Sequence, residues 1–306
     1  DSFQIESTDG FESIALKSDG TVAAWGDNSY GSSNVPVGLS NVVQIAKGGY
    51  FSVALQANGN IVCWGRNDVN QSEPPYGWQG AYQIALGGRD NHAECFADIL
   101  KADGTLVTRG YFADGYIPLP IGTSPVKQVS AGTYHSAALK PDGTLVFWGN
   151  NGYGQCNIPT GLGSVAQVSA GYIGTVALLS DGTVQAWGYT GNGATNVPSG
   201  LSNVTQVFSG YEANFAIKSD GTVVAWGYPG NGQIDIPSGL TNVVQVVNSY
   251  TTSMALKSDG SIVGWGWDGY GKLSGGLGVT GLTQIGMAFA HVVGLRTDGT
   301  FVGWGN

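Results

Sequence analysis

Apolar residues along this chain come in short runs rich in β-branched and aromatic side chains, such as Thr222–Trp226, separated by clusters of Gly, Asn, Asp and Ser. Residues of these types favour extended backbone, and runs this short are typical of strands. No run reaches the 18 consecutive apolar residues that a membrane-spanning helix needs. The pattern therefore predicts an all-β protein built from many short strands.

A Trp-Gly pair, replaced by Arg-Gly in one unit, recurs along the chain at intervals of 39 residues, with one longer interval of 45. The seven pairs begin at Trp25, Trp64, Trp148, Trp187, Trp226, Trp265 and Trp304. Arg109-Gly110 fills the single gap, in the same local context. A fixed period of this length indicates a repeat architecture. Because the first and last units are both complete, we count eight units; a ring of seven with an overlapping terminal unit is the alternative.

Each unit predicts three strands, which we call A, B and C. Strand A carries Gln-Ile or Gln-Val, strand B carries Ala-Leu-Lys, and strand C ends in Trp-Gly. An Asp-Gly or Asn-Gly pair, for example Asp220-Gly221, separates B from C and admits the positive φ angles of a type I′ hairpin turn. The linker after strand C contains Pro, as at Pro237, and Pro lacks the N–H that a central strand must donate. This linker can therefore form at most a short strand at the outer edge.

One three-stranded sheet cannot bury both of its faces, whereas sheets stacked face to face around an axis bury them all. We therefore predict a single domain over residues 1–306, a β-propeller of eight short blades, with seven blades as the alternative. The Trp of strand C recurs in nearly every unit, so its expected role is to fill the space between neighbouring blades.

Several runs of the repeat support a family resemblance: Ala15–Val22, Ala24–Gly26, Tyr153–Gln155 and Asn196–Leu201. They resemble the repeats of the regulator-of-chromosome-condensation family, in a short form that a protein inhibitor of β-lactamases also uses. The resemblance implies the propeller fold and is less specific for function, because that family includes nucleotide-exchange factors, chromatin binders and enzyme inhibitors. This chain has one complete unit more than the inhibitor, so the target of the inhibitor is not transferred.

Charge and cysteine content exclude several kinds of ligand and cross-link. The formal net charge is −9 and the pI is about 4.6, which argues against nucleic acid as a partner. The three cysteines, Cys63, Cys95 and Cys156, have no zinc-site spacing, and their odd number excludes a fully paired disulfide framework. The chain begins with Asp1 rather than Met, which fits a processed, secreted protein and equally fits a sequence cut at this point from a longer one. We expect a monomer without a membrane span or a cofactor.

Chain direction sorts the loops onto two ends of the ring: A–B loops and the loops after strand C share one end, and the Asp-Gly turns occupy the other. At the end with the Asp-Gly turns, which we call the turn end, a Lys or Arg recurs beside the turn Asp in most units. This periodic mixture of charges indicates a solvated structural rim. The other end gathers aromatic residues, acids such as Glu12, Asp27, Glu212 and Asp268, and residues of the irregular third unit. Its candidate binding residues are Tyr30, Tyr50, Phe51, Arg89, His92, Tyr134, Tyr153, Tyr172, Tyr189, Tyr211, Tyr228, Tyr250, Trp267, Tyr270 and Phe289.

Exposed Tyr and Trp side chains supply stiff, amphipathic contact area and dominate binding hot spots. We therefore expect a recognition scaffold that binds a partner protein through this aromatic, acidic end. The resemblance further implies that the bound partner could be an enzyme that is inhibited, because aromatic loop residues bind the partner in the inhibitor that this chain resembles. A lectin with several weak, repeat-encoded sugar sites is the alternative, because aromatic rings beside Asp and Asn suit saccharides.

Unit 3 departs from the repeat with a six-residue excess before Asp103, with Arg109 in place of Trp, and with an irregular linker. His92 and Glu94 would share a strand face, but no third metal ligand is identifiable, so a specificity loop or a packing variation is the expected role. The Ser-Asp-Gly-Thr turns do not match the spacing of the sialidase Asp box, and no catalytic triad or phosphate loop is present. We predict no catalytic residue and no metal site.

Two histidines, His135 and His291, occupy one repeat position, and we expect them to have structural roles. Cys63 lies beside Trp64 on strand C and reads as a small core residue.

Overall fold

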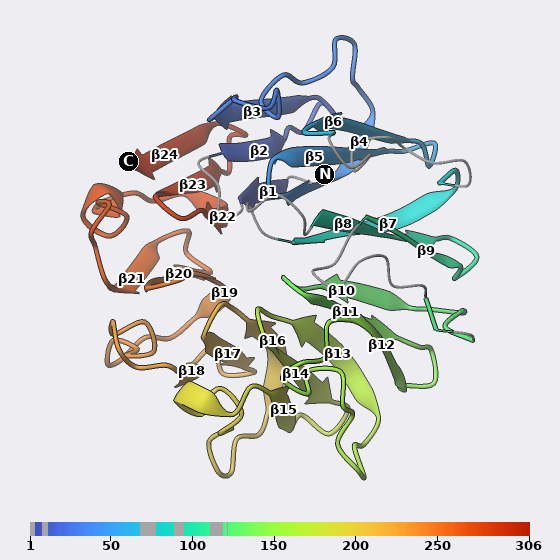
Figure 1. Cartoon of the computed structure of the whole chain (residues 1–306). Coiled ribbons are helices and arrows are strands. Elements are labelled where there is room, and N and C mark those ends of the chain that lie inside the picture. Colours follow the sequence, from blue (N-terminus) through green and yellow to red (C-terminus); the bar gives the residue numbers. More distant parts are fainter. Residues whose placement is uncertain (1–3, 8–11, 68–77, 89–94, 111–118, 121) are drawn as a thin grey trace.

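The computed structural model describes residues 4–7, 12–67, 78–88, 95–110, 119–120 and 122–306. Within them the chain forms eight three-stranded antiparallel sheets arranged as blades around a central axis (Figure 1). Each blade is a meander in which A pairs with B and B pairs with C. The prediction of eight blades is confirmed. The seven-blade alternative is wrong, because the first and last units each form a complete sheet.

The strands have these bounds in chain order, three to a blade. Blades 1 to 4 are β1 Gln4–Ser7, β2 Glu12–Leu16, β3 Val22–Gly26; β4 Val42–Gly48, β5 Phe51–Gln56, β6 Ile61–Gly65; β7 Ala81–Gly88, β8 Cys95–Lys101, β9 Leu106–Gly110; β10 Gln128–Ala131, β11 His135–Leu139, β12 Leu145–Gly149. Blades 5 to 8 are β13 Val165–Ala170, β14 Gly174–Leu179, β15 Val184–Gly188; β16 Val204–Ser209, β17 Ala213–Lys218, β18 Val223–Gly227; β19 Val243–Ser249, β20 Thr252–Lys257, β21 Ile262–Gly266; β22 Leu282–Met287, β23 His291–Arg296, β24 Phe301–Gly305. Two single-turn 3-10 helices lie in linkers, η1 Gly191–Gly193 and η2 Ser274–Gly276.

The A strands line the axis and the C strands lie outermost (Figure 1). Blade 8 packs on blade 1, so the ring closes. Across this junction His291 Nε2 lies 2.7 Å from the Ser13 hydroxyl, and Ala15 is buried in one cluster with Val293 and Leu295. No helix among the described residues is long and apolar enough to cross a bilayer.

The turn between B and C differs from the predicted type I′ form. Gly20 has φ +74°, but Asp19 is not among the residues with positive φ. The Gly20 N–H donates to the Lys17 carbonyl, and the Lys17 N–H donates to the Thr21 carbonyl. This is a three-residue loop, a type I turn followed by a left-handed Gly. The Asp19 carboxylate accepts from both the N–H and the hydroxyl of Thr21. These side-chain bonds stabilise the turn without a positive φ at Asp19.

The Asp-Gly turns also hold neighbouring blades together. The Gly20 carbonyl accepts the N–H of Val42, the first residue of β4 in the next blade, at 3.0 Å. The same bond joins the next six junctions along the chain, ending with Leu282 to Gly260. The carboxylates themselves remain exposed, as the prediction of a solvated rim requires. The turn Gly is therefore a structural contact as well as a turn former.

A glutamine near the start of strand A forms a second link between blades. A register shift after Val42 brings the Gln44 side chain toward blade 3, where its amide donates to the Ile84 carbonyl and accepts from the Ile84 N–H. The side-chain amide thus makes the pair of bonds that a neighbouring strand would make. The same arrangement joins blades 3 and 4, 5 and 6, and 7 and 8, through Gln83, Gln167 and Gln245.

The tryptophans fill the junctions between blades, as predicted. Trp64, Trp148, Trp187, Trp226 and Trp265 are buried, each in a cluster shared with the preceding blade. Trp64, Trp226, Trp265 and Trp304 also donate their indole N–H to a carbonyl of the linker that precedes their blade. The linkers contain no strand within the described residues. Linker and Trp therefore close the outer side of a junction together.

Strand B supplies a second donor to the same linker carbonyl. The Gln233 carbonyl accepts from the Ser253 hydroxyl and from the Trp265 indole, both at 2.8 Å. The Ala194 carbonyl accepts likewise from Asn214 and Trp226. Two donors from one blade thus hold one carbonyl of the preceding linker.

Unit 3 differs from the regular units because its strand B carries a buried carboxylate. Asp98 lies in strand B, is fully buried, and accepts a 2.5 Å hydrogen bond from Ser136 in blade 4. Burial raises the pKa of Asp98 to about 6, and the hydrogen bond from Ser136 opposes this shift. Arg109, which stands in place of the Trp of strand C, is half-buried.

We expect Asp98→Asn to stabilise the protein near neutral pH and to have little effect at pH 4. The folded state binds more protons than the unfolded state between the unfolded pKa, near 3.8, and the folded pKa, near 6. This carboxyl therefore lowers the unfolding free energy as pH rises through that range. Urea unfolding at pH 4 and pH 7 should show a gain of about 2–3 kcal/mol for the variant at pH 7 only. An equal effect at both pH values would contradict the assignment.

Candidate functional site

One end of the ring carries a row of aromatic side chains from successive A–B loops. The ring centroids lie 5.2 Å apart for Tyr134 and Tyr172, 4.0 Å for Tyr172 and Tyr211, and 4.2 Å for Tyr211 and Tyr250. Phe289 continues the row 5.3 Å from Tyr250. We call these five residues the aromatic ladder. It spans blades 4 to 8, because each residue occupies the equivalent loop of its own blade.

Loops that follow strand C extend the aromatic surface outward. Tyr270 lies 5.1 Å from Phe289 and 5.4 Å from Trp267, which is 48% exposed. Tyr153, which is 53% exposed, lies 5.3 Å from Tyr189. The ring of Tyr228 folds over its own loop, against Gly230, as a ring that covers backbone does.

A separate aromatic group lies at blades 1 and 2. Tyr30 and Tyr50 pack with ring centroids 4.7 Å apart, and the Arg66 guanidinium lies 5.0 Å above the Tyr30 ring. Arg66 is buried, so the ring and the cation hold each other in place. Sequence reasoning missed Arg66. Its position directly after Trp64-Gly65, where the other units have Asp, Asn, Tyr or Trp, was the available signal.

Phe51 is not part of the binding face, contrary to the sequence prediction. It is the first residue of β5, has no exposed surface, and belongs to the core cluster between blades 2 and 3. Its ring lies directly against Gly48. In the pair Tyr50-Phe51 only the tyrosine lies in the loop, because the strand begins between the two residues.

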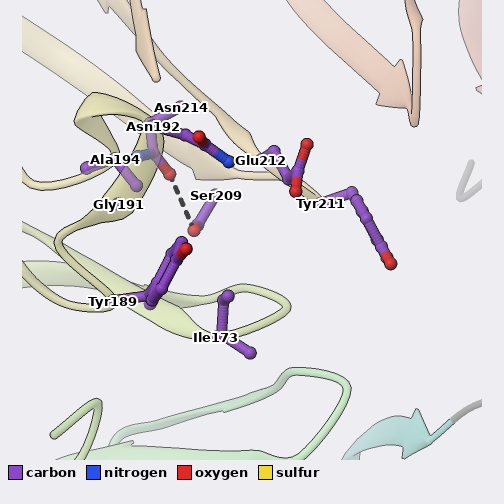
Figure 2. A pocket seen from close by; sticks show the side chains of 11 residues that line it. Ile173, Tyr189, Gly191, Asn192, Ala194, Ser209, Tyr211, Glu212 and Asn214 are labelled. Atoms are coloured by element: carbon purple, nitrogen blue, oxygen red, sulfur yellow. Dashed lines mark hydrogen bonds between the residues drawn. The ribbon is translucent and has the colours of Figure 1, made fainter. Parts of the chain in front are cut away.

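Two hollows open on the aromatic end. One, of 410 Å³, is bordered by Tyr172, Tyr211 and Tyr250 together with the polar side chains Thr133, Ser209, Asn248 and Ser249. The other, of 320 Å³, lies between blades 5 and 6 and is bordered by Tyr189, Tyr211, Glu212 and Asn214 (Figure 2). The Ser209 hydroxyl donates to the Asn214 side chain at its wall. The hollow beside Tyr172 and Tyr250 is the more open of the two.

The acids of this end have different environments. Glu12 does not contribute surface charge, because it is buried and forms an ion pair with buried Lys47 of blade 2. Asp268 accepts from the backbone N–H groups of Leu273 and Ser274 and so orders its own loop. Hydrogen bonds from the hydroxyl and N–H of Ser29 lower the pKa of Asp27. Asp27, Glu212 and Asp268 therefore contribute negative charge beside the aromatic surface.

The two histidines have the structural roles that their shared repeat position predicts. His135 Nε2 lies 2.8 Å from the Thr175 hydroxyl of blade 5, and His291 Nε2 lies against Ser13 of blade 1. Burial lowers the pKa of His135 to about 4 and also lowers that of His291. Both side chains are therefore neutral links between blades near pH 7.

Other predicted residues have mixed outcomes. Arg89 and His92 lie outside the described residues, as does Glu94. No group of three His, Cys, Asp or Glu side chains within the described part of the chain could hold a metal. Cys63 packs against the core cluster between blades 2 and 3, as predicted, and both Cys63 and Cys156 are free thiols. Burial raises the pKa of each thiol to about 12, which makes both poor nucleophiles.

Comparisons with known proteins agree with this architecture. The family model "Regulator of chromosome condensation (RCC1) repeat" matches residues 42–71, 126–155 and 204–233. The CRINKLY WD40 ectodomain of the Arabidopsis thaliana receptor kinase ACR4 has a TM-score of 0.63 and 19% identity, over 87% of this chain and 94% of that one. The ectodomain of the Physcomitrella patens receptor kinase CR4 has a TM-score of 0.60 and 17% identity, over 99% and 74%. The designed protein Ika8 has a TM-score of 0.56 and 18% identity, over 97% and 93%.

No curated protein matches the sequence. At these identities the solved structures establish the fold alone. The protein is a repeat β-propeller, and three segments of it match the RCC1 repeat.

We expect His135 to support stability above pH 6.5 and to oppose folding in acid. The folded pKa, near 4, lies below the unfolded value of 6.5, so the unfolded state binds more protons between these limits. The contribution is complete above pH 6.5 and is lost as pH falls toward 4. Replacing His135 with Gln should flatten the pH dependence of the unfolding free energy by about 2–3 kcal/mol across this window.

The matched control for this measurement is His291→Gln, at the same repeat position. Its imidazole is half-buried rather than fully buried, so the same substitution should flatten the profile less. Identical profiles for wild-type protein and His135→Gln would contradict a buried, neutral imidazole at position 135.

Proposed function

We propose that this propeller is a non-enzymatic scaffold that binds a partner protein through the aromatic ladder and the exposed rings beside it. The observation that carries the proposal is the continuous packing of Tyr134, Tyr172, Tyr211, Tyr250 and Phe289 across five blades. A structural role in one blade does not require rings from successive blades to pack on one another.

The ladder has the physical properties of a binding surface that is ordered before the partner arrives. Each tyrosine is half-buried and packed by its neighbours, so binding restricts few additional rotamers. The loops rest on a rigid frame, and exposed Trp267 and Tyr153 extend the surface outward. Aromatic residues in such positions contribute much of the binding energy of protein interfaces.

Charge indicates the kind of partner. Glu212 directly follows Tyr211 at the ladder, and Asp27 and Asp268 lie in the loops after strand C. A partner with a basic patch would complement them and associate faster at low salt. Inhibition of an enzyme is one form that such binding would take, where the covered surface includes an active site.

Carbohydrate binding is the second candidate, supported by the hollow of 410 Å³ that places Thr133, Asn248 and Ser249 beside tyrosine rings. Sugar recognition by stacking requires a free aromatic face. Tyr172, Tyr211 and Tyr250 stack face to face at interplanar angles of 27° and 30°, so their faces already cover one another. Protein binding therefore fits the ladder better.

Replacing Tyr172, Tyr211 and Tyr250 together with Ser should abolish capture of the partner by the immobilised protein, while the ring remains folded. The reason is that these rings supply the centre of the proposed interface but lie outside the core between blades. The measurement is affinity capture from an extract with mass-spectrometric quantification, together with circular dichroism of the variant.

The matched control is Tyr82→Ser. Tyr82 is 69% exposed on β7 near the turn end, so its loss should leave capture unchanged. Undiminished capture by the triple variant would contradict the proposal. Release of the captured protein by simple saccharides would favour the lectin instead.

A further inference from the structure

The hollow of 320 Å³ between blades 5 and 6 is bordered by one carboxylate and two tyrosine rings (Figure 2). Tyr211 and Glu212 come from the A–B loop of blade 6, and Tyr189 comes from the loop after strand C of blade 5. The Tyr189 ring lies directly against Gly191, so its own loop holds it in position. Ile173 of blade 5 adds an apolar side chain to the lining. We call this feature the Glu212 hollow.

The Glu212 carboxylate differs from the other polar groups in the wall of the hollow. Asn214 donates to the Ala194 carbonyl and accepts from the Ser209 hydroxyl, both at 2.8 Å, so these side chains are engaged with the protein. Glu212 is half-buried, and its carboxylate has no hydrogen bond or ion pair among the described residues. A charged acceptor in the lining is therefore available to a ligand.

No basic residue of this chain lines the Glu212 hollow. The sequence from residue 141 to residue 217 contains no Lys, Arg or His. Lys218, which comes next, is the last residue of β17 and pairs with Asp220 at the turn end. Lys272 is buried and donates to the Phe289 carbonyl. The described part of the chain therefore supplies no positive charge to this hollow.

The junction between blades 1 and 2 shows how the same end of the protein arranges such groups where a cation is present. Glu12 of blade 1 forms a buried ion pair with Lys47 of blade 2. The Arg66 guanidinium, which follows blade 2, lies 5.0 Å above the Tyr30 ring of the preceding linker. Carboxylate and tyrosine at this end thus have cations as partners within the protein itself.

Glu212 is a departure from the repeat. Residues at the same repeat position are Ile173 in unit 5, Thr251 in unit 7 and Ala290 in unit 8. The frame of the propeller therefore does not require an acid at this position. A residue that breaks the repeat without a structural contact is a candidate for an individual function.

We propose that the Glu212 hollow binds an arginine side chain of the partner protein. A guanidinium is planar and always charged, so it pairs with the Glu212 carboxylate and lies against the Tyr189 ring at the same time. The apolar stem of the arginine packs along Ile173. This inference rests on the proposed function and specifies one contact that the partner makes.

The test uses the whole protein, labelled at its isoleucine methyl groups for NMR, and N-acetyl-arginine amide as the probe. The Ile173 signal, assigned by its loss in Ile173→Val, should shift saturably because this side chain lines the hollow. N-acetyl-citrulline amide has nearly the same shape without the charge and should bind about tenfold more weakly. Equal binding of these two probes would overturn the charge pairing.

A third probe separates arginine from lysine. N-acetyl-lysine amide should bind more weakly than the arginine probe, because an ammonium does not pair in a planar, bidentate way with a carboxylate. Equal affinity of the lysine and arginine probes would overturn the assignment of arginine.

A pair of matched variants locates the contact. Glu212→Gln keeps the size of the side chain but removes its charge, and should weaken binding of the arginine probe about tenfold. Asp235→Asn removes the same charge from the linker after blade 6, outside the hollow, and should bind as the wild type does. Three other linkers have Asn at this position, as Asn34, Asn157 and Asn196. Equal losses in both variants would overturn the local contact in favour of a general effect of charge.

Failure of this inference is distinguishable from failure of the proposed function. If the triple tyrosine variant loses capture but the arginine probe does not shift the Ile173 signal, the arginine contact is overturned and the scaffold stands. If the triple variant captures the partner undiminished, assignment of the hollow to that partner is overturned, even where the probe binds. Capture reduced by Glu212→Gln and not by Asp235→Asn is the supporting result.

Discussion

The hydrogen bond from a blade to a carbonyl of the preceding linker is the interaction that the regular junctions share. A three-stranded blade has two apolar faces, and a stable protein cannot leave either face exposed to water. The strand C tryptophan covers the outer part of one face, and its burial favours a partner for the indole N–H. The linker carbonyls of Ser32, Ala194, Gln233 and Lys272 accept from this indole. At the junction of blades 4 and 5 the linker carbonyl of Gln155 accepts from Thr175 instead, and the Trp187 indole has no partner among the described residues. The turn Gly and the strand A glutamine make the corresponding bonds at the other end and at the axis.

The residues that join neighbouring blades are therefore different from the residues that form the aromatic end. The bonds between blades come from backbone groups and from side chains at fixed repeat positions, and they leave the A–B loops free to vary at their tips. The ladder occupies those tips across blades 4 to 8. Unit 3 departs from the regular repeat at its junction with blade 4. In this unit buried Asp98 accepts a hydrogen bond from Ser136 of the next blade, and burial raises the pKa of this carboxyl.

The sequence predicts the frame well because each frame residue recurs. The 39-residue period, the Trp-Gly pairs and the Asp-Gly pairs suffice for eight blades, for the order of strands and for the end on which each loop lies. The turn type was wrong because Asp-Gly suits both two-residue and three-residue loops, and the choice depends on which residues pair across the hairpin. The prediction for Phe51 was wrong because the pattern of apolar and polar residues does not show whether strand B begins at Tyr50 or at Phe51.

Features that join distant residues were not predictable from one chain. The packing of Tyr172 on Tyr211 depends on the rotation between blades, and the ion pair of Glu12 in β2 with Lys47 in β4 depends on how blades 1 and 2 pack. The same holds for Arg66 over Tyr30. Most ladder positions do recur at the 39-residue period, but the period does not show that the rings contact one another. Glu12, Lys47 and Arg66 lie at positions that vary between units, so no period marks them. The individual properties of this propeller lie at these varying positions.

The most direct test of this account compares the unfolding free energies of two equivalent substitutions, Trp265→Phe and Trp187→Phe. Both tryptophans are buried between blades, but the Trp265 indole donates to the Gln233 carbonyl, whereas the Trp187 indole has no hydrogen-bond partner among the described residues. Urea unfolding should show a loss of about 1–2 kcal/mol for Trp265→Phe, since a buried hydrogen bond is removed, and a clearly smaller loss for Trp187→Phe. Equal losses at the two positions would contradict the claim that the linker carbonyl holds neighbouring blades together.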